Sequence, residues 1–230
     1  MGSSVKLKTI VVIPCLNEET FIQDTVIRSK KYVDEVIVID DGSTDNTSEV
    51  ARAAGAEVIQ HKKRHGAGAA TRSGFIAAKA KYVDVLVTLD GDGQHDPDDI
   101  PSLVSPVIDK NVDLVIGSRF LSSQTNIRRY RKFGIDVITW LCNVGSKVKV
   151  SDSQCCFRAH SRKLMDNIDI IENGFGFSVE VLIKARKMGL TIGEIPISCV
   201  YHSQSSSMNP IIHGLSVALD VIKYRFRTLS

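Results

Sequence analysis

Short runs of β-branched and other apolar residues alternate with helical stretches through the first half of the chain. Such spacing is typical of βαβ units, in which the strands run parallel and helices cover both faces of the sheet. We therefore predict an α/β fold with a mostly parallel, Rossmann-like sheet flanked by helices. The expected strands are Thr9–Ile13, Glu35–Ile39, Glu57–Gln60, Val83–Leu89 and Asp113–Ile116.

The second half of the chain is less regular. We expect helices over Ile135–Val144 and Ser178–Met188, then a strand over Thr191–Ile197, and finally an amphipathic helix. No internal repeat or low-complexity linker interrupts the chain. The prediction is one domain over residues 1–210 with a C-terminal amphipathic helix over residues 211–230.

Composition restricts the class of protein. Of the 230 residues, 43% are apolar and 24% charged, which is usual for globular proteins and excludes a collagen-like or disordered chain. The net charge of +3 gives no reason to expect a nucleic-acid partner. The five cysteines include no CxxC pair, so neither a zinc ribbon nor a disulfide framework is expected. Since the sequence contains neither a signal peptide nor an apolar run of the ~18 residues that span a membrane, we expect a cytoplasmic protein.

Two carboxylates stand one residue apart directly after the fourth expected strand, in Asp90-Gly91-Asp92. Hard oxygen ligands of this kind suit Mg²⁺ or Mn²⁺, and Gln94 adds a neutral oxygen. Gly91 lets a phosphate approach the backbone closely. The motif predicts a divalent-metal site that neutralises a leaving diphosphate. An acidic, solvated turn explains the same short motif equally well.

Other polar loops close strands at the same expected edge of the sheet. Pro14, Cys15 and Glu18 end the first strand, and Asp41 ends the second. A carboxylate there can accept hydrogen bonds from a base or a ribose, which a phosphate cannot donate. Arg119 follows the fifth strand and is a candidate phosphate ligand. The alternatives are helix capping by the carboxylates and a surface ion pair for the arginine.

Five segments, in order along the chain, resemble the family 2 glycosyltransferases and, within them, the dolichol-phosphate mannose and polyprenyl-phosphate glucose synthases. These segments are Val12–Glu19, Ile39–Asp45, Leu89–His95, Gly117–Phe120 and Ser151–Arg158. No single motif is decisive, but five in register are highly specific. Matches to the same branch at Gly174–Glu180 and Glu194–Ile197 extend the resemblance over nearly the whole chain.

The resemblance implies a GT-A fold, a nucleotide-diphosphate sugar as donor, Mg²⁺ or Mn²⁺ as cofactor, and inversion at the anomeric carbon. It also implies which residues line the nucleoside pocket of the donor. These are Pro14, Cys15, Glu18 and Asp41.

The same resemblance implies how the metal and the phosphates are held. Asp90, Asp92 and Gln94 would bind the metal, and Gly91 belongs to the same donor-binding loop. Arg119 would contact the phosphates.

The acceptor that this branch implies is a polyprenyl phosphate at the cytosolic membrane face. Asp152 and Arg158 match the family's acceptor-side motif, and Asp92, Asp152 and Arg119 are the residues expected to act in catalysis. A phosphate monoester is already anionic at neutral pH, since its second pKa is about 6, so transfer to it needs no general base. Electrostatic positioning then supplies most of the catalysis.

Two features depart from the family's usual pattern. Many mannosyl members carry an arginine and a lysine where this chain has His202 and Met208. Cys15 stands where an aromatic residue that stacks on the base is frequent. The donor sugar therefore stays open among GDP-mannose, UDP-glucose and UDP-N-acetylglucosamine.

Two segments are candidates for peripheral contact with a membrane. A basic cluster over Arg128–Lys132 precedes the helix that holds the only tryptophan, Trp140, and the final helix carries Lys223, Arg225 and Arg227. Basic amphipathic helices bind anionic lipid surfaces. The alternative for both helices is packing onto the sheet, or contact between two copies in a homodimer.

Two other functions compete with transfer to a lipid. The same fold can act on a hydroxyl group of a glycan or small molecule, which requires a general base, and Asp152 or Glu180 would be the candidates. From another class, the chain would be an inactive, membrane-associated scaffold subunit. The intact Asp90, Asp92 and Gln94 argue against the scaffold.

Overall fold

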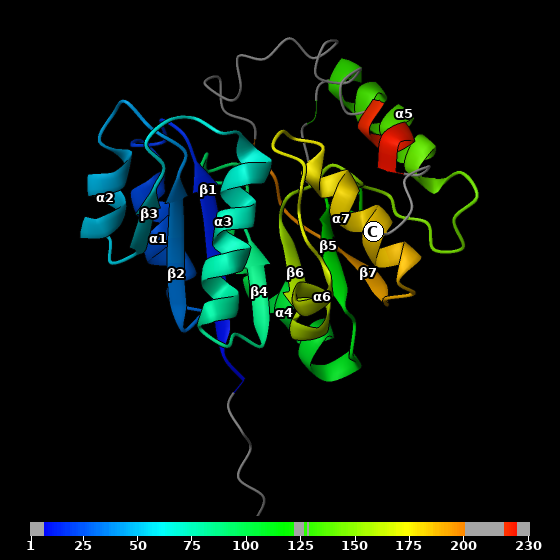
Figure 1. Cartoon of the computed structure of the whole chain (residues 1–230), viewed down its shortest axis with the longest axis horizontal. Coiled ribbons are helices and arrows are strands. Elements are labelled where there is room, and N and C mark those ends of the chain that lie inside the picture. Colours follow the sequence, from blue (N-terminus) through cyan, green and yellow to red (C-terminus); the bar gives the residue numbers. More distant parts are fainter. Residues whose placement is uncertain (1–6, 122–126, 128, 201–218, 225–230) are drawn as a thin grey trace, which may run out of the picture.

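A computed structural model describes residues 7–121, 127, 129–200 and 219–224 (Figure 1). Seven strands form one sheet in the order β3-β2-β1-β4-β6-β5-β7. The strands are β1 Thr9–Cys15, β2 Glu35–Asp40, β3 Glu57–Gln60, β4 Val85–Thr88, β5 Leu114–Ser118, β6 Arg158–Ser161 and β7 Ile192–Pro196. The helices are α1 Ile22–Ser29, α2 Thr47–Ala53, α3 Ala67–Ala80, the 3₁₀ turn η1 Pro97–Asp99, α4 Ile100–Lys110, α5 Arg129–Asn143, α6 Arg162–Asn167 and α7 Phe177–Lys187.

The sheet is mostly parallel and is covered by helices on both faces, as predicted (Figure 1). Helix α3 packs on β1 and β2 on one face, and α4 packs on β4 to β7 on the other. In the centre, Val11 of β1 pairs with Val36 of β2 and with Val87 of β4. All three side chains are buried, which explains why these strands are continuous apolar runs in the sequence.

Strand β6 was not predicted, and it is the one antiparallel strand among those described, pairing with β4 and with β5. Its sequence, Arg-Ala-His-Ser, lacks the apolar character of a central strand. Arg158 and His160 of this strand are nevertheless buried and make contacts through their side chains. His160 Nε2 lies 3.2 Å from the Thr88 hydroxyl, and its ring packs edge-on against Phe75. Tertiary contacts, rather than local propensity, make this segment a strand.

Two helices differ from their predicted extent. Helix α5 begins at Arg129 rather than Ile135, so Tyr130 and Lys132 of the basic cluster belong to its first turn. Of the expected C-terminal helix, residues 219–224 are described and are helical. There Val221 and Tyr224 are buried in the core. Arg128, His202, Met208, Arg225 and Arg227, together with the expected boundary at residue 210, lie outside the described residues. Among the described helices, none is long and apolar enough to cross a membrane.

Helix α3 lies unusually close to β1 at Gly74. A Cβ atom added there would lie 2.1 Å from Cγ1 of Val12, so the helix backbone nearly touches the strand's side chains. By contrast, a Cβ at Gly134 in α5 would meet nothing within 4 Å.

The pair Gly74→Ala and Gly134→Ala tests this packing, because the same substitution is made inside two helices. Alanine is the better helix former by about 1 kcal/mol, so Gly134→Ala should raise the free energy of unfolding. Gly74→Ala should lower it by about 1–3 kcal/mol, because overpacking outweighs the gain in propensity. Urea denaturation of both variants checks the prediction, and stabilisation by Gly74→Ala would contradict the close approach.

Candidate active site

The loop that follows β4 places two carboxylates at the carboxyl edge of the sheet. Leu89 is fully buried and its N–H donates to the carbonyl of Val12, which fixes the start of the loop beside β1. Asp90 and Asp92 then emerge half-buried. The backbone N–H of Gln94 donates to Asp92 Oδ1 over 3.0 Å, and the Gln94 amide donates to Asp92 Oδ2. Gln94 thus orients one carboxylate of the pair.

Glu18 joins these carboxylates from the start of α1. Its backbone N–H donates to the Thr47 hydroxyl over 2.8 Å, and its carbonyl accepts from the first turn of α1. Burial, followed by the charges of Asp92 and Asp90, raises the pKa of Glu18 to about 7. Burial and the charge of Asp92 likewise raise the pKa of Asp90 to about 7, although Arg119 acts in the opposite direction. The cluster therefore holds more negative charge than its neighbours neutralise.

This excess of charge fits a divalent cation. No three His, Cys, Asp or Glu side chains of the described residues converge tightly enough to hold a metal ion by themselves. Mg²⁺ and related ions commonly use one or two carboxylates and complete their shell with water and substrate phosphates. A further sign is His95, which is buried, with its Nδ1 atom lacking a hydrogen-bond partner among the described residues and lying 3.9 Å from Asp90 Oδ2. The donor set suits a metal that is shared with a diphosphate.

The loops after β1 and β4 are in contact with each other. Gly91 lies so close to Cys15 that an added Cβ would be 3.0 Å from the Cβ of the cysteine. The Cys15 thiol is buried and donates to the carbonyl of Ile39, and burial followed by nearby carboxylates raises its pKa far above the usual range. Cys15 is therefore a neutral thiol. It packs where the two loops meet, next to half-buried Pro14.

Asp41 is held between the end of β2 and the loop before α3. Its carboxylate accepts from the backbone N–H groups of His65 and Gly66 at 2.9 and 2.7 Å, and it lies 2.7 Å from His61 Nδ1. His61 in turn contacts the Ser73 hydroxyl through Nε2 at 2.9 Å. A carboxylate offers about four acceptor positions, so three contacts leave room for one more donor. Neither histidine was identified from the sequence, although His61 directly follows the third strand.

Arg119 follows β5 and forms a two-pronged ion pair with Asp152. Its Nε and Nη2 atoms donate to the two carboxylate oxygens at 2.7 and 2.9 Å. Asp152 is fully buried, whereas 12% of the Arg119 side chain is exposed. Burial alone would raise the pKa of Asp152, but the charge and hydrogen bonds of Arg119 hold that pKa below its ordinary value. Asp152 therefore stays ionised behind the arginine.

The segment that carries Asp152 is fixed from two sides. Glu194 of β7 accepts from the backbone N–H groups of Ser151 and Asp152 at 2.7 and 3.1 Å. The buried guanidinium of Arg158 donates to three carbonyls, those of Ser153, Cys155 and Ser178, at 2.6 to 2.8 Å. Arg158 thus ties this segment to the start of α7 and does not face the open edge of the site.

Glu180, the other candidate base, is fully buried in α7. Its carboxylate pairs with Lys184 at 2.9 Å and accepts from the backbone N–H groups of Ile171 and Glu172 at 3.0 and 2.8 Å. These contacts explain its burial, because a buried charge requires partners. Of the residues predicted from the sequence, Glu18, Asp90, Asp92 and Arg119 come together, whereas Arg158 and Glu180 are structural.

The chain has recognisable relatives among known proteins. The family described as "Glycosyl transferase family 2" matches residues 10–169. A UDP-N-acetylglucosamine–dolichyl-phosphate N-acetylglucosaminyltransferase of Methanococcus voltae is 31% identical over 221 residues, covering 85% of this chain and 86% of that protein. An undecaprenyl-phosphate mannosyltransferase of Micrococcus luteus is 31% identical over 210 residues, covering 84% of each chain.

A solved structure resembles the whole described fold. Glucosyl-3-phosphoglycerate synthase from Mycobacterium tuberculosis, in complex with Mn²⁺, uridine diphosphate and glucosyl-3-phosphoglycerate, superposes with a TM-score of 0.74. It is 26% identical, and the match covers 95% of this chain and 78% of that one. The family match spans more than half of the chain and the fold agrees. The chain therefore belongs to glycosyl transferase family 2 and is a glycosyltransferase with the predicted GT-A fold.

Proposed function

We propose that the protein transfers a sugar from a nucleotide-diphosphate sugar to a polyprenyl phosphate, with inversion and with a divalent metal. The observation that carries this proposal is that both candidate general bases are inaccessible. Asp152 and Glu180 are fully buried and engaged in ion pairs, so neither is placed to remove a proton from a hydroxyl group. An acceptor that is already anionic avoids that requirement. The relatives from M. voltae and M. luteus are named for transfer to polyprenyl phosphates, which supports the same acceptor.

On the donor side, Asp90 and Asp92 would hold Mg²⁺ or Mn²⁺, with Gln94 orienting Asp92. A bound divalent ion would neutralise the diphosphate as it leaves. Glu18 adds negative charge to the same place and favours cation binding. Pro14, Cys15 and Asp41 line the neighbouring stretch of the edge, where we place the nucleoside.

Arg119 is the cation that we assign to the donor phosphates. Its guanidinium is oriented by Asp152, and its charge acts on Asp90 of the carboxylate loop. A bidentate pair restricts the arginine to one geometry. In this proposal Asp152 is a positioning residue, which acts through Arg119 rather than on the acceptor. Arg158 positions Asp152 from behind.

For the donor we propose a uridine nucleotide. The M. voltae relative is named for a UDP-sugar, and the M. tuberculosis synthase was also solved with Mn²⁺ and UDP-glucose, at 26% identity and a TM-score of 0.73. We leave UDP-glucose and UDP-N-acetylglucosamine as alternatives. Because polyprenyl phosphate resides in membranes, the proposal includes peripheral contact with a membrane surface.

A second candidate acceptor is the hydroxyl group of a small phosphorylated molecule. The structural likeness to glucosyl-3-phosphoglycerate synthase favours it. The inaccessibility of Asp152 and Glu180 argues in the other direction. An assay that offers both acceptors separates the two candidates.

Transfer should depend on Asp92. We expect incubation with radiolabelled UDP-sugars or GDP-mannose, Mn²⁺ and a short polyprenyl phosphate to move label into the organic phase. Asp92→Asn should slow transfer by at least about a hundredfold, because the diphosphate would lose its charge stabilisation. Asp98→Asn is the matched control, since the carboxylate of Asp98 pairs with Arg28 instead.

Three outcomes would contradict the proposal. Label that stays in the water phase with every donor would exclude the lipid acceptor. Label appearing on 3-phosphoglycerate alone would establish the second candidate. Near wild-type transfer by Asp92→Asn would remove the metal role.

The raised pKa of Glu18 predicts a pH dependence of stability in the presence of a chelator. Between the ordinary glutamate pKa and about 7, the folded protein binds more protons at Glu18 than the unfolded chain does. Stability contributed by this group is therefore lost as the pH rises through that range. Relative to Glu18→Gln, the wild type should lose stability between pH 5 and pH 7.5, as measured by urea denaturation. Parallel curves for the two proteins would contradict the crowding of carboxylates.

A further inference from the structure

Helix α5 has an apolar face that no described element covers. Its members are spaced three and four residues apart, which places them on one side of the helix. They are Phe133, Val137 and Trp140 of α5 and Val144, which directly follows the helix, with exposed fractions of 40% to 71%. On the opposite side, Ile138 and Cys142 are buried in the core. An apolar face of this size on a surface helix is a sign of a binding surface.

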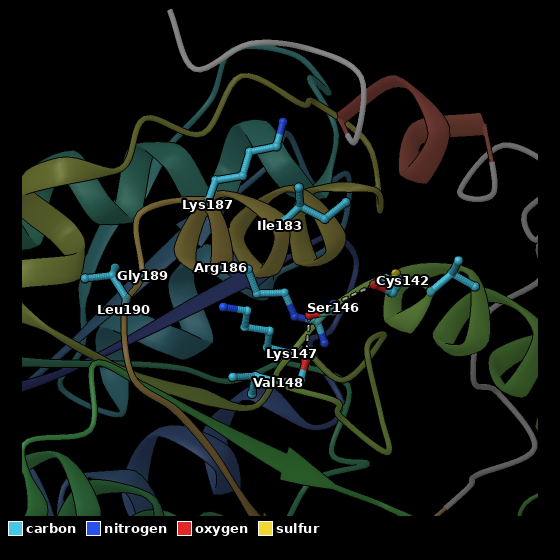
Figure 2. A pocket seen from close by; sticks show the side chains of 11 residues that line it. Cys142, Ser146, Lys147, Val148, Ile183, Arg186, Lys187, Gly189 and Leu190 are labelled. Atoms are coloured by element: carbon cyan, nitrogen blue, oxygen red, sulfur yellow. Dashed lines mark hydrogen bonds between the residues drawn. The ribbon is translucent and has the colours of Figure 1, made fainter.

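A cavity of about 480 Å³ lies at the end of this helix, between α5 and α7 (Figure 2). Its apolar wall includes Val148, Ile183 and Leu190. Its charged side chains are Lys147, Arg186 and Lys187, and no acidic residue lines it. Such a cavity suits a ligand that is anionic at one end and apolar at the other.

The cavity continues the exposed face of α5, because Val144 belongs to both. It is separate from the donor site. Gly189 and Leu190 of the cavity precede the amino end of β7, whereas Asp90 follows the carboxyl end of β4. The strand pairings make β4 and β7 point in the same direction, so the two places lie toward opposite edges of the sheet.

Part of the positive charge has a structural role. Arg186 donates to the carbonyl of Cys142 and to the side-chain oxygen of Asn143, at 2.6 and 2.8 Å, and so caps α5. Lys187 donates to the carbonyl of Tyr224 over 2.7 Å, and Figure 2 shows its side chain pointing away from the other two cations. Lys147 is exposed and makes no hydrogen bond or ion pair with the described residues.

We propose that this cavity binds the phosphate of an anionic membrane lipid while the exposed face of α5 lies in the membrane interface. The lining of the cavity selects this occupant, because it holds Lys147 and no acidic side chain, which suits an anionic headgroup, and because acyl chains complement the aromatic face. The lipid bound here is not the acceptor but holds the enzyme at the surface where a lipid acceptor would be found. The inference deepens the membrane contact in the proposed function, yet it is testable without any transfer reaction.

The test is binding of the full chain to vesicles of phosphatidylcholine, with and without phosphatidylglycerol. Trp140, the only tryptophan, reports entry into the interface through a blue shift of its fluorescence. We expect the shift with anionic vesicles. Lys147→Glu should weaken that binding about tenfold more than Lys149→Glu, because Lys149 is equally exposed but does not line the cavity. Equal losses would overturn the cavity and leave only diffuse surface charge.

Further arms exclude other occupants. Inorganic phosphate is the second probe. If Lys147→Glu abolishes binding of phosphate but leaves binding to vesicles unchanged, the cavity is a site for a free anion.

Sedimentation equilibrium is the third measurement. A wild-type dimer that Phe133→Ser dissociates, combined with no vesicle binding, would assign the face of α5 to a second copy of the chain. Urea denaturation, unchanged in Lys147→Glu, shows that the variant is folded, so this result does not depend on the proposed function.

Discussion

The ion pair between Arg119 and Asp152 is the constraint on which the rest of the site depends. Both charges lie largely out of water, and a buried pair is favourable only when its geometry and remaining hydrogen bonds are good. The chain meets this condition with distant groups, since Glu194 of β7 fixes the backbone of Asp152 and Arg158 fixes the residues that follow. Because the Asp152 carboxylate is paired with Arg119, it is not available as a general base. In the proposed function, the same pair therefore orients a cation toward the donor and restricts the acceptors to those that need no general base.

A cluster of carboxylates supplies the negative charge of the site, as Arg119 supplies positive charge. Burial, together with the mutual repulsion of Glu18, Asp90 and Asp92, raises the pKa of Glu18 and of Asp90. Such crowding is unfavourable in the empty protein and is relieved when a cation enters. In the proposed function, cation binding and relief of this repulsion are therefore coupled.

The sequence alone predicted those elements that depend on residues close together along the chain. The central strands are continuous apolar runs, and the carboxylates Asp90 and Asp92 follow one of them directly, as the sequence predicts. What could not be predicted depends on partners far along the chain. Strand β6 is polar in sequence and is buried because Thr88, Phe75 and backbone carbonyls receive its side chains. The sequence places Asp152 in an acceptor-side motif. Only the structure shows that it pairs with Arg119, 33 positions earlier. His95 belongs to one of the matched motifs, but only the structure shows that it is buried beside Asp90.

The reversed direction of β6 has a consequence for the shape of the active edge. In a wholly parallel sheet, each neighbouring strand would deliver its following loop to this edge. Here β6 lies between β4 and β5, so the loops bearing Asp90 and Arg119 are two strand spacings apart, about 10 Å. Because β6 runs antiparallel to both strands, the segment that precedes it, rather than one that follows it, reaches this edge. That segment carries Asp152, so the carboxylate that orients Arg119 comes from the strand inserted between the two loops.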